Sequence, residues 1–212
     1  MKTLVLTGYD NRFEPIGRLT LSRIVSYAAK HGFYLFCMRN PPEGCSIELH
    51  PSWWKMYFLR KCFNNYDRVI WIDADILVTN LDIIPPGDTG YHCSLDWGVD
   101  ATEPHHLSNC CFTAFPDCVD LVNWVIDNRC VFSQLFHEQE HVREAAAGPF
   151  GNIITVHPRR IFNAVPIEIH ESAVDPWKPG DWVAHLTMVD QAERVRLVPI
   201  IEEQVEKWKK SV

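Results

Sequence analysis

The spacing of apolar residues predicts a chain in which strands and helices alternate. Short apolar runs suited to strands occupy residues 3–7, 33–38, 69–72, 91–95, 110–115 and 153–156, and residues 182–186 form a further apolar stretch. Between the first two runs, Leu21, Ile24, Val25 and Ala28 recur at helical spacing, and Gly32 provides a C-terminal stop. This β-α-β opening predicts two parallel strands joined by a right-handed crossover.

Four more helical segments are expected. Ser52 caps a helix that runs to about residue 65, Asp117 opens another, residues 133–147 are helical, and Pro199 lies in the first turn of a last helix ending near Lys210. The alternation predicts one α/β domain with a mixed, mostly parallel central sheet and helices on both faces.

Composition narrows the classes of function. The 212 residues suffice for one sizeable core, and the net charge of −7 argues against a nucleic-acid partner. No run of about 18 apolar residues could span a membrane, and the apolar stretch at residues 3–7 is too short for a signal peptide. The eight cysteines contain no Cys-x-x-Cys pair, which argues against structural zinc and favours free thiols in a reducing compartment. We therefore expect a cytoplasmic protein.

Two aspartates follow the apolar run at residues 69–72. Asp73 and Asp75 flank the small Ala74, and strand alternation would place both carboxylates on one side. There they repel each other unless a cation lies between them, and this edge of an open α/β sheet is where ligands bind. The pattern indicates a metal site. The simpler interpretation is a loop in which Asp caps the following segment, because Asp-x-Asp patterns are short and common.

Other chemical signals are weaker or absent. Lys55 is a lone cation near the start of an apolar helix, and a snorkelling surface lysine would look the same. No glycine-rich phosphate loop occurs, which disfavours P-loop NTPases and Rossmann dehydrogenases. No Gly-x-Ser-x-Gly occurs either, which weakens a serine hydrolase.

Five stretches resemble, in the same order, the retaining galactosyl-, mannosyl- and xylosyltransferase family of GT-A glycosyltransferases. They are Trp53-Trp54-Lys55, residues 66–80 ending in the Asp-x-Asp, Glu138-Gln139, residues 160–163 and residues 180–185. The chain is similar also to glycosyltransferase domains of large algal viruses. It departs from the family at Asn109-Cys110-Cys111, where the usual Asn-x-Gly lacks its glycine.

The resemblance implies transfer of a hexose-type sugar from a UDP-sugar to a glycan or glycoprotein acceptor, with retention of anomeric configuration and with Mn²⁺ or Mg²⁺ as cofactor. It implies a nucleotide-binding half at about residues 1–100 and a sugar and acceptor half at about residues 101–212. The implied metal ligands are Asp73, Asp75 and His185. A metal ion would neutralise the charge that develops on the leaving diphosphate. An imidazole ligand favours Mn²⁺ over Mg²⁺. Without the resemblance, His185 would be read as a core histidine.

The resemblance also implies roles around the nucleotide and the sugar. Thr7, Gly8 and Tyr9 would hold uracil and ribose, with Tyr9 stacked on the base. Lys55 and Asp73 would contact the donor. Glu138 would be the catalytic acid on the β-face of the sugar, with Gln139 and Asp96 holding its hydroxyls and Asp96 counted also as catalytic.

Two other classes of function stay open. A metal-dependent phosphohydrolase or nucleotidyltransferase could use the same two aspartates, although two-metal sites usually need more carboxylates. A sugar- or nucleotide-binding module without catalysis is the other. Within the transferase interpretation, an inverting enzyme would use one of these acids as a general base toward the acceptor hydroxyl.

Overall fold

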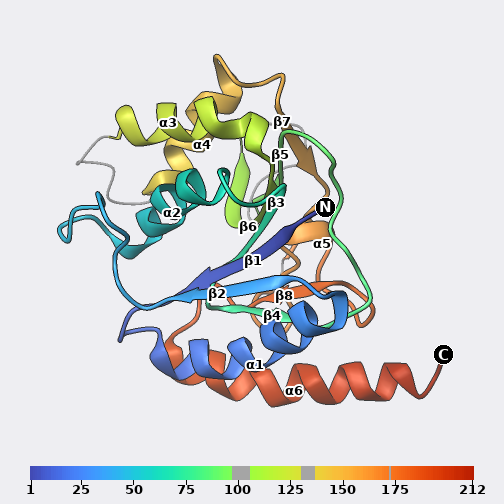
Figure 1. The fold of residues 1–212 in the computed structure, drawn as a ribbon. Coiled ribbons are helices and arrows are strands. Elements are labelled where there is room, and N and C mark those ends of the chain that lie inside the picture. Colours follow the sequence, from blue (N-terminus) through green and yellow to red (C-terminus); the bar gives the residue numbers. More distant parts are fainter. Residues whose placement is uncertain (97–105, 130–136, 172) are drawn as a thin grey trace.

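A computed structural model describes residues 1–96, 106–129, 137–171 and 173–212. Its centre is a six-stranded sheet in the order β2-β1-β3-β6-β5-β7 (Figure 1). The strands are β1 (Thr3–Gly8), β2 (Tyr34–Met38), β3 (Arg68–Ile72), β5 (Tyr91–Leu95), β6 (Leu107–Ala114) and β7 (Ile154–His157). Only β6 runs antiparallel to its neighbours within this sheet. The predicted mixed, mostly parallel sheet is confirmed.

A second, two-stranded sheet is formed by β4 (Ile76–Val78) and β8 (Val183–His185). The strands are antiparallel, and Ile76 pairs with His185. This pairing brings the chain around His185 next to the Asp-x-Asp turn, because the amide of Leu186 donates to the Asp75 carbonyl at 2.9 Å. No sequence signal predicted β4.

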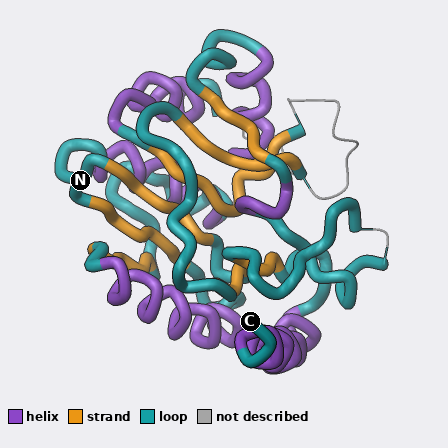
Figure 2. Tube along the Cα trace, turned by 90° about the vertical axis from the view of Figure 1, so that its right-hand side faces the viewer, coloured by secondary structure: helices purple, strands orange, loops and turns teal. Residues whose placement is uncertain are grey.

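Helices cover both faces of the central sheet, as predicted. One group is α2 (Trp54–Cys62), α3 (Val119–Asp127) and α4 (Glu138–Ala147), and the other is α1 (Glu14–His31) and α6 (Gln191–Lys209) (Figures 1 and 2). The short α5 (Arg159–Phe162) and two 3-10 turns, η1 (Pro51–Trp53) and η2 (Pro116–Cys118), complete the described elements.

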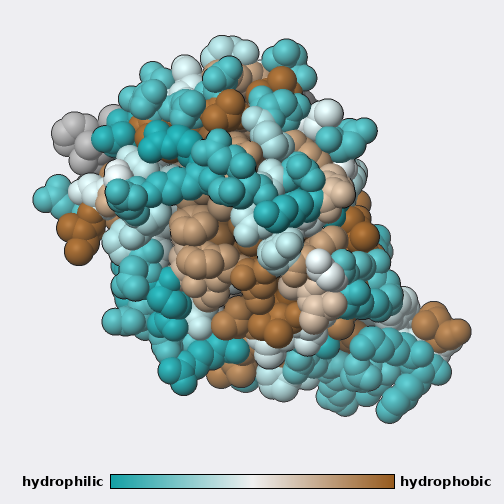
Figure 3. All heavy atoms as spheres, in the orientation of Figure 1, coloured by the Kyte–Doolittle hydropathy of each residue, from teal (hydrophilic) through white to brown (hydrophobic). Residues whose placement is uncertain are grey.

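Strand alternation explains the two layers of the core. Leu4 and Leu6 of β1 pack in the cluster that contains α2, α3 and α4, whereas Val5 between them packs with Ile24 and Tyr27 of α1. Successive side chains of a strand point to opposite faces, so a strand buried on both sides must be apolar throughout. The outer strand β2 is less covered. Tyr34 and Phe36 are 54% and 45% exposed, and Figure 3 shows an apolar patch on this face of the molecule.

Several local predictions are confirmed. The first helix ends at Gly32, which adopts a left-handed conformation (φ 64°) and donates its amide hydrogen to helix carbonyls. Asp117 lies in η2 and the helix α3 follows. Of the helix expected at residues 133–147, residues 133–136 lie outside the described residues, and the described part is helical from Glu138.

Other local predictions are wrong. His50, not Ser52, caps the turn before α2, because its Nδ1 accepts the Ser52 amide hydrogen at 3.3 Å. Val25 is 47% exposed rather than core-facing. The last helix begins at Gln191, eight residues before Pro199, because the Asp190 carboxylate accepts the Glu193 amide hydrogen and caps it. No helix in the described part of the chain is long and apolar enough to cross a membrane.

Candidate active site

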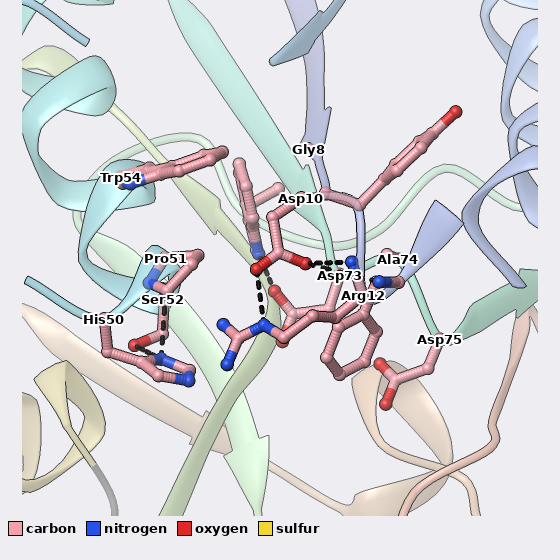
Figure 4. A pocket seen from close by; sticks show the side chains of 13 residues that line it. Gly8, Asp10, Arg12, His50, Pro51, Ser52, Trp54, Asp73, Ala74 and Asp75 are labelled. Carbon is pink, nitrogen blue, oxygen red and sulfur yellow. Dashed lines mark hydrogen bonds and ion pairs between the residues drawn. The ribbon is translucent and has the colours of Figure 1, made fainter. Parts of the chain in front are cut away.

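The candidate site lies at the carboxyl ends of β1 and β3, where two hollows meet. The smaller, of about 150 Å³, is lined by the turn after β1, by η1 and by the Asp-x-Asp turn (Figure 4). The larger, of about 400 Å³, is lined by Lys55, Asp73, Asp75, Asp96, Glu138, Gln139 and His185, among others. Asp73 and Asp75 line both. The structure thus gathers nearly all of the predicted site residues from six separate parts of the chain.

The two aspartates occupy a turn rather than a continuing strand. The amide of Ile76 donates to the Asp73 carbonyl at 3.1 Å, which closes the turn between β3 and β4. Strand alternation therefore does not position the two side chains. Both nevertheless line the same two hollows, and Figure 4 shows them pointing in different directions. Each has its own cationic partner.

Asp73 belongs to a buried cluster centred on Lys55. The Lys55 ammonium lies 3.1 Å from Asp73 Oδ1, 2.9 Å from Glu138 Oε1 and 2.9 Å from the Asn109 carbonyl, so all three of its N–H donors have partners. Burial acts to lower the pKa of Lys55, but Asp73 and Glu138 outweigh it and raise the pKa. Burial raises the pKa of Asp73 to about 6, opposed by Lys55 and reinforced by Asp75 and Glu138. Lys55 is thus an internal counter-ion rather than a snorkelling surface lysine.

Asp75 pairs with His185 and Arg194. Its Oδ1 lies 3.6 Å from His185 Nε2 and its Oδ2 lies 3.4 Å from an Arg194 terminal nitrogen. Burial acts to raise the pKa of Asp75, but the hydrogen bond and charge of His185 and the charge of Arg194 hold it below its usual range. Arg194 was not predicted, because the sequence placed the start of the last helix too late.

His185 is oriented by Asn163. Its Nδ1 lies 2.6 Å from Asn163 Oδ1, and the Asn163 amide nitrogen donates to the Leu95 carbonyl, which fixes the acceptor toward the ring. His185 Nδ1 therefore carries a hydrogen, and Nε2 faces Asp75. Burial acts to lower the pKa of His185, but Cys110 and Asp75 raise it. The place of Asn163 in the motif at residues 160–163 was the available sequence signal for this role.

Glu138 and Gln139 both line the larger hollow, but they differ in how completely their side chains are hydrogen-bonded. Glu138 is 3% exposed; its Oε1 is bound by Lys55 and by the Asn109 side-chain amide, while its buried Oε2 has no hydrogen-bond partner. Gln139 is engaged at both ends, because its Oε1 accepts the Asn109 amide hydrogen and its Nε2 donates to Asp96 at 3.4 Å. Gln139 thus ties β6 to Asp96, and Asp96 also accepts a 2.6 Å hydrogen bond from Arg143.

Of the three residues predicted to bind the nucleotide, two line the smaller hollow and one lies inside β1. Gly8 and Tyr9 line the smaller hollow. Thr7 is 1% exposed inside β1 and lines neither hollow, so its side chain is not placed to contact a ligand. Tyr9 is 6% exposed, its ring packs on Gly17, and the Arg39 guanidinium lies 4.2 Å from the ring centroid. Stacking of a base on Tyr9 would require Arg39 to move.

The side chains of Asp73, Asp75 and His185 suit a hard divalent cation, but they are not already arranged as a metal-binding group. Two carboxylates and an imidazole with a directed Nε2 line one hollow, and these are ligands that Mn²⁺ and Mg²⁺ accept. Among the described residues, however, no three His, Cys, Asp or Glu side chains already form a metal-binding group. A metal ion would compete with Lys55 for Asp73 and with Arg194 for Asp75.

No protein-family model matches the sequence, and a search of curated proteins finds no match. Solved structures do match. One is a glycosyltransferase involved in the glycosylation of the major capsid of PBCV-1, with a TM-score of 0.70 and 15% identity over 94% of this chain and 100% of that chain. The galactosyltransferase LgtC matches with a TM-score of 0.59 and 12% identity over 99% and 100% of the two chains. The glycosyltransferase GlyE of Streptococcus pneumoniae TIGR4 matches with a TM-score of 0.57 and 12% identity over 100% of this chain and 64% of that chain. The chain has the GT-A fold of these glycosyltransferases, as the sequence predicted.

Proposed function

We propose that the protein is a glycosyltransferase that moves a hexose-type sugar from a UDP-sugar to a carbohydrate acceptor with the help of a divalent metal ion. The observation that carries the proposal is the convergence of Asp73, Asp75, His185 and Glu138 on one hollow of about 400 Å³, at the ligand-binding edge of a GT-A fold. Fold likeness alone would not be sufficient, because one fold can host many activities.

Asp73, Asp75 and His185 would hold the metal ion. When bound, a divalent ion supplies a Lewis acid that neutralises negative charge on a leaving diphosphate. Asn163 supports this assignment, because it holds the hydrogen on His185 Nδ1 and turns Nε2 toward Asp75. Lys55 and Arg194 offset the negative charge of the two aspartates.

Glu138 would face the reacting sugar. Glu138 lines the hollow, and its buried Oε2 has no hydrogen-bond partner. A small movement of the side chain would let this oxygen accept a hydrogen bond or approach a centre that gains positive charge as the glycosidic bond breaks. That position suits transfer with retention, in which a carboxylate stabilises the anomeric carbon or attacks it as a nucleophile. Asp96 would bind a sugar hydroxyl, and Gln139 would hold Asp96 in place.

The proposal is tested with UDP-, GDP- and CDP-sugars offered with and without Mn²⁺ to a panel of sugar acceptors. We expect a new glycoside and free UDP, with little product in the absence of metal. Asp75→Ala should abolish transfer, whereas Asp82→Ala, which removes a carboxylate paired only at the surface with Lys30, should not. Formation of nucleoside monophosphate and sugar phosphate would indicate a phosphohydrolase instead. UDP binding without turnover on any acceptor would indicate a binding module.

A further inference from the structure

A third hollow, of about 430 Å³, lies beside the end of β5. It is lined by Leu95 of β5, Val156 and His157 of β7, Arg159 of α5, and by Val174 and Asp175, among others. Leu95 lines this hollow, whereas the next residue, Asp96, lines the larger hollow of the candidate active site. The two spaces are therefore neighbours, separated by the end of β5.

Among the described residues, the guanidinium of Arg159 is a buried cation without a counter-ion. The residue is 4% exposed, and its Nε donates to the Asp96 carbonyl at 2.6 Å. Its Nη2 is buried with no hydrogen-bond partner, and no carboxylate in the described part of the chain forms an ion pair with it. Buried charges are normally paired and buried donors normally satisfied, because leaving them alone costs free energy.

The adjacent arginine shows what a satisfied guanidinium looks like in this chain. Arg160 donates to both carboxylate oxygens of Asp181, at 2.9 Å and 2.6 Å for the shortest contacts. The hydrogen bonds that Arg160 donates to Asp181 are the main reason that the pKa of Arg160 is raised, and the charge of Asp175, which lines the third hollow, adds to the rise. Asp175 is thus close enough to act on Arg160, while it forms no ion pair with Arg159.

His157 gives the hollow an uncharged polar group. His92 Nε2 donates to the Thr89 carbonyl at 2.6 Å. When His92 is neutral, its Nδ1 therefore accepts the hydrogen that His157 Nε2 donates at 3.0 Å. Burial and His92 lower the pKa of His157, which keeps its ring neutral with Nδ1 as an acceptor. A neutral imidazole of this tautomer can accept a hydrogen bond from a hydroxyl group.

We infer that this third hollow binds an acidic sugar, with the carboxylate of a uronic acid or the phosphate of a sugar phosphate paired to Arg159. The planar guanidinium matches either oxyanion with two parallel hydrogen bonds. Val156 and Val174 offer apolar surface for a ring face, and His157 offers an acceptor for a hydroxyl group. The inference does not depend on the proposed transferase activity.

The test measures binding of glucuronate, glucose 6-phosphate and glucose to the whole chain by calorimetry. The wild type should bind at least one of the two acidic sugars saturably and should not bind glucose. Arg159→Met should lower that affinity at least tenfold, because the oxyanion loses the cation that it pairs with. Arg196→Met is the matched control, since Arg196 lies at the surface and is paired with Glu193; it should bind like the wild type.

Two further measurements separate ligand binding from a structural role. Without ligand, Arg159→Met should lose little stability, because removing an uncompensated buried charge offsets the loss of the hydrogen bond that Nε donates to the Asp96 carbonyl. Asp75→Ala should keep the affinity for the acidic sugar, whether or not the transferase proposal is correct. The inference is overturned if the wild type binds neither acidic sugar, or if Arg159→Met binds them as tightly as the wild type does.

Discussion

Replacing Lys55 with Met is expected to destabilise the protein by about 3–5 kcal/mol, the usual cost of removing one partner from a buried ion pair. Lys55 is 3% exposed and its ammonium contacts both Asp73 and Glu138. Met keeps most of the side-chain volume, so the loss reports on charge rather than on a cavity. For a chain of this length, the melting temperature should fall by roughly 6–20 °C.

The stability lost in Lys55→Met should be larger at high pH than at low pH. Burial already raises the pKa of Asp73 to about 6 while Lys55 opposes the rise, so removing Lys55 should raise it further. A carboxyl group whose folded pKa exceeds its unfolded value of about 4 reduces stability above that value, and the reduction is complete once the pH passes the folded pKa. Lys55→Met should therefore lose more stability at pH 8 than at pH 5.

Urea unfolding at the two pH values measures this effect, and the same helix supplies the control. Lys61 of α2 pairs with Glu43 at 3.0 Å, but its side chain is 43% exposed, so Lys61→Met should change stability by less than about 1 kcal/mol. Adding Glu138→Gln to Lys55→Met should restore part of the loss, because only the Asp73 carboxylate would then lack a cation. If Lys55→Met loses no more than Lys61→Met, or loses equally at both pH values, the charge-compensation reasoning is refuted.

Three further predictions concern the proposed site. His185→Gln should weaken Mn²⁺ binding roughly 10–100-fold. The affinity of the wild type for Mn²⁺ should rise with pH, because the raised pKa of His185 makes a proton compete with the metal. A pH-independent affinity measured by calorimetry would count against His185 as a ligand. Arg194→Gln should strengthen Mn²⁺ binding by the nucleotide-free protein, because Asp75 loses a competing cation; weaker binding would contradict that. Glu138→Gln should lower turnover roughly 100-fold or more without weakening UDP binding, and NMR of the wild-type product should show retention. Full activity of this variant would remove Glu138 from the mechanism, and inversion would end the retaining assignment.

Local sequence patterns were sufficient for most of the sheet. The strands at residues 69–72 and 91–95 and the helix ending at Gly32 follow from apolar period, length and a left-handed stop, which depend on neighbours in sequence. Capping was predicted less well. The start of the last helix was placed at Pro199 because proline favours a first turn, yet the Asp190 cap decided the boundary. Pro199 lies inside that helix, and Leu197 and Ile201 on either side of it are buried.

The sequence by itself placed Asp73 and Asp75 at the end of a buried strand, because an apolar run predicts a buried strand and the acids that follow it favour a polar edge. What surrounds those acids was decided by the tertiary structure. The pairing of β4 with β8 sets His185 beside Asp75 from more than a hundred residues away, and α6 adds Arg194 to the same carboxylate. The packing of α2 and α4 turns Lys55 from an apparent surface cation into a buried counter-ion. The physical reason is that burial follows local periodicity, whereas the partner of a buried charge depends on which distant segments the fold brings together.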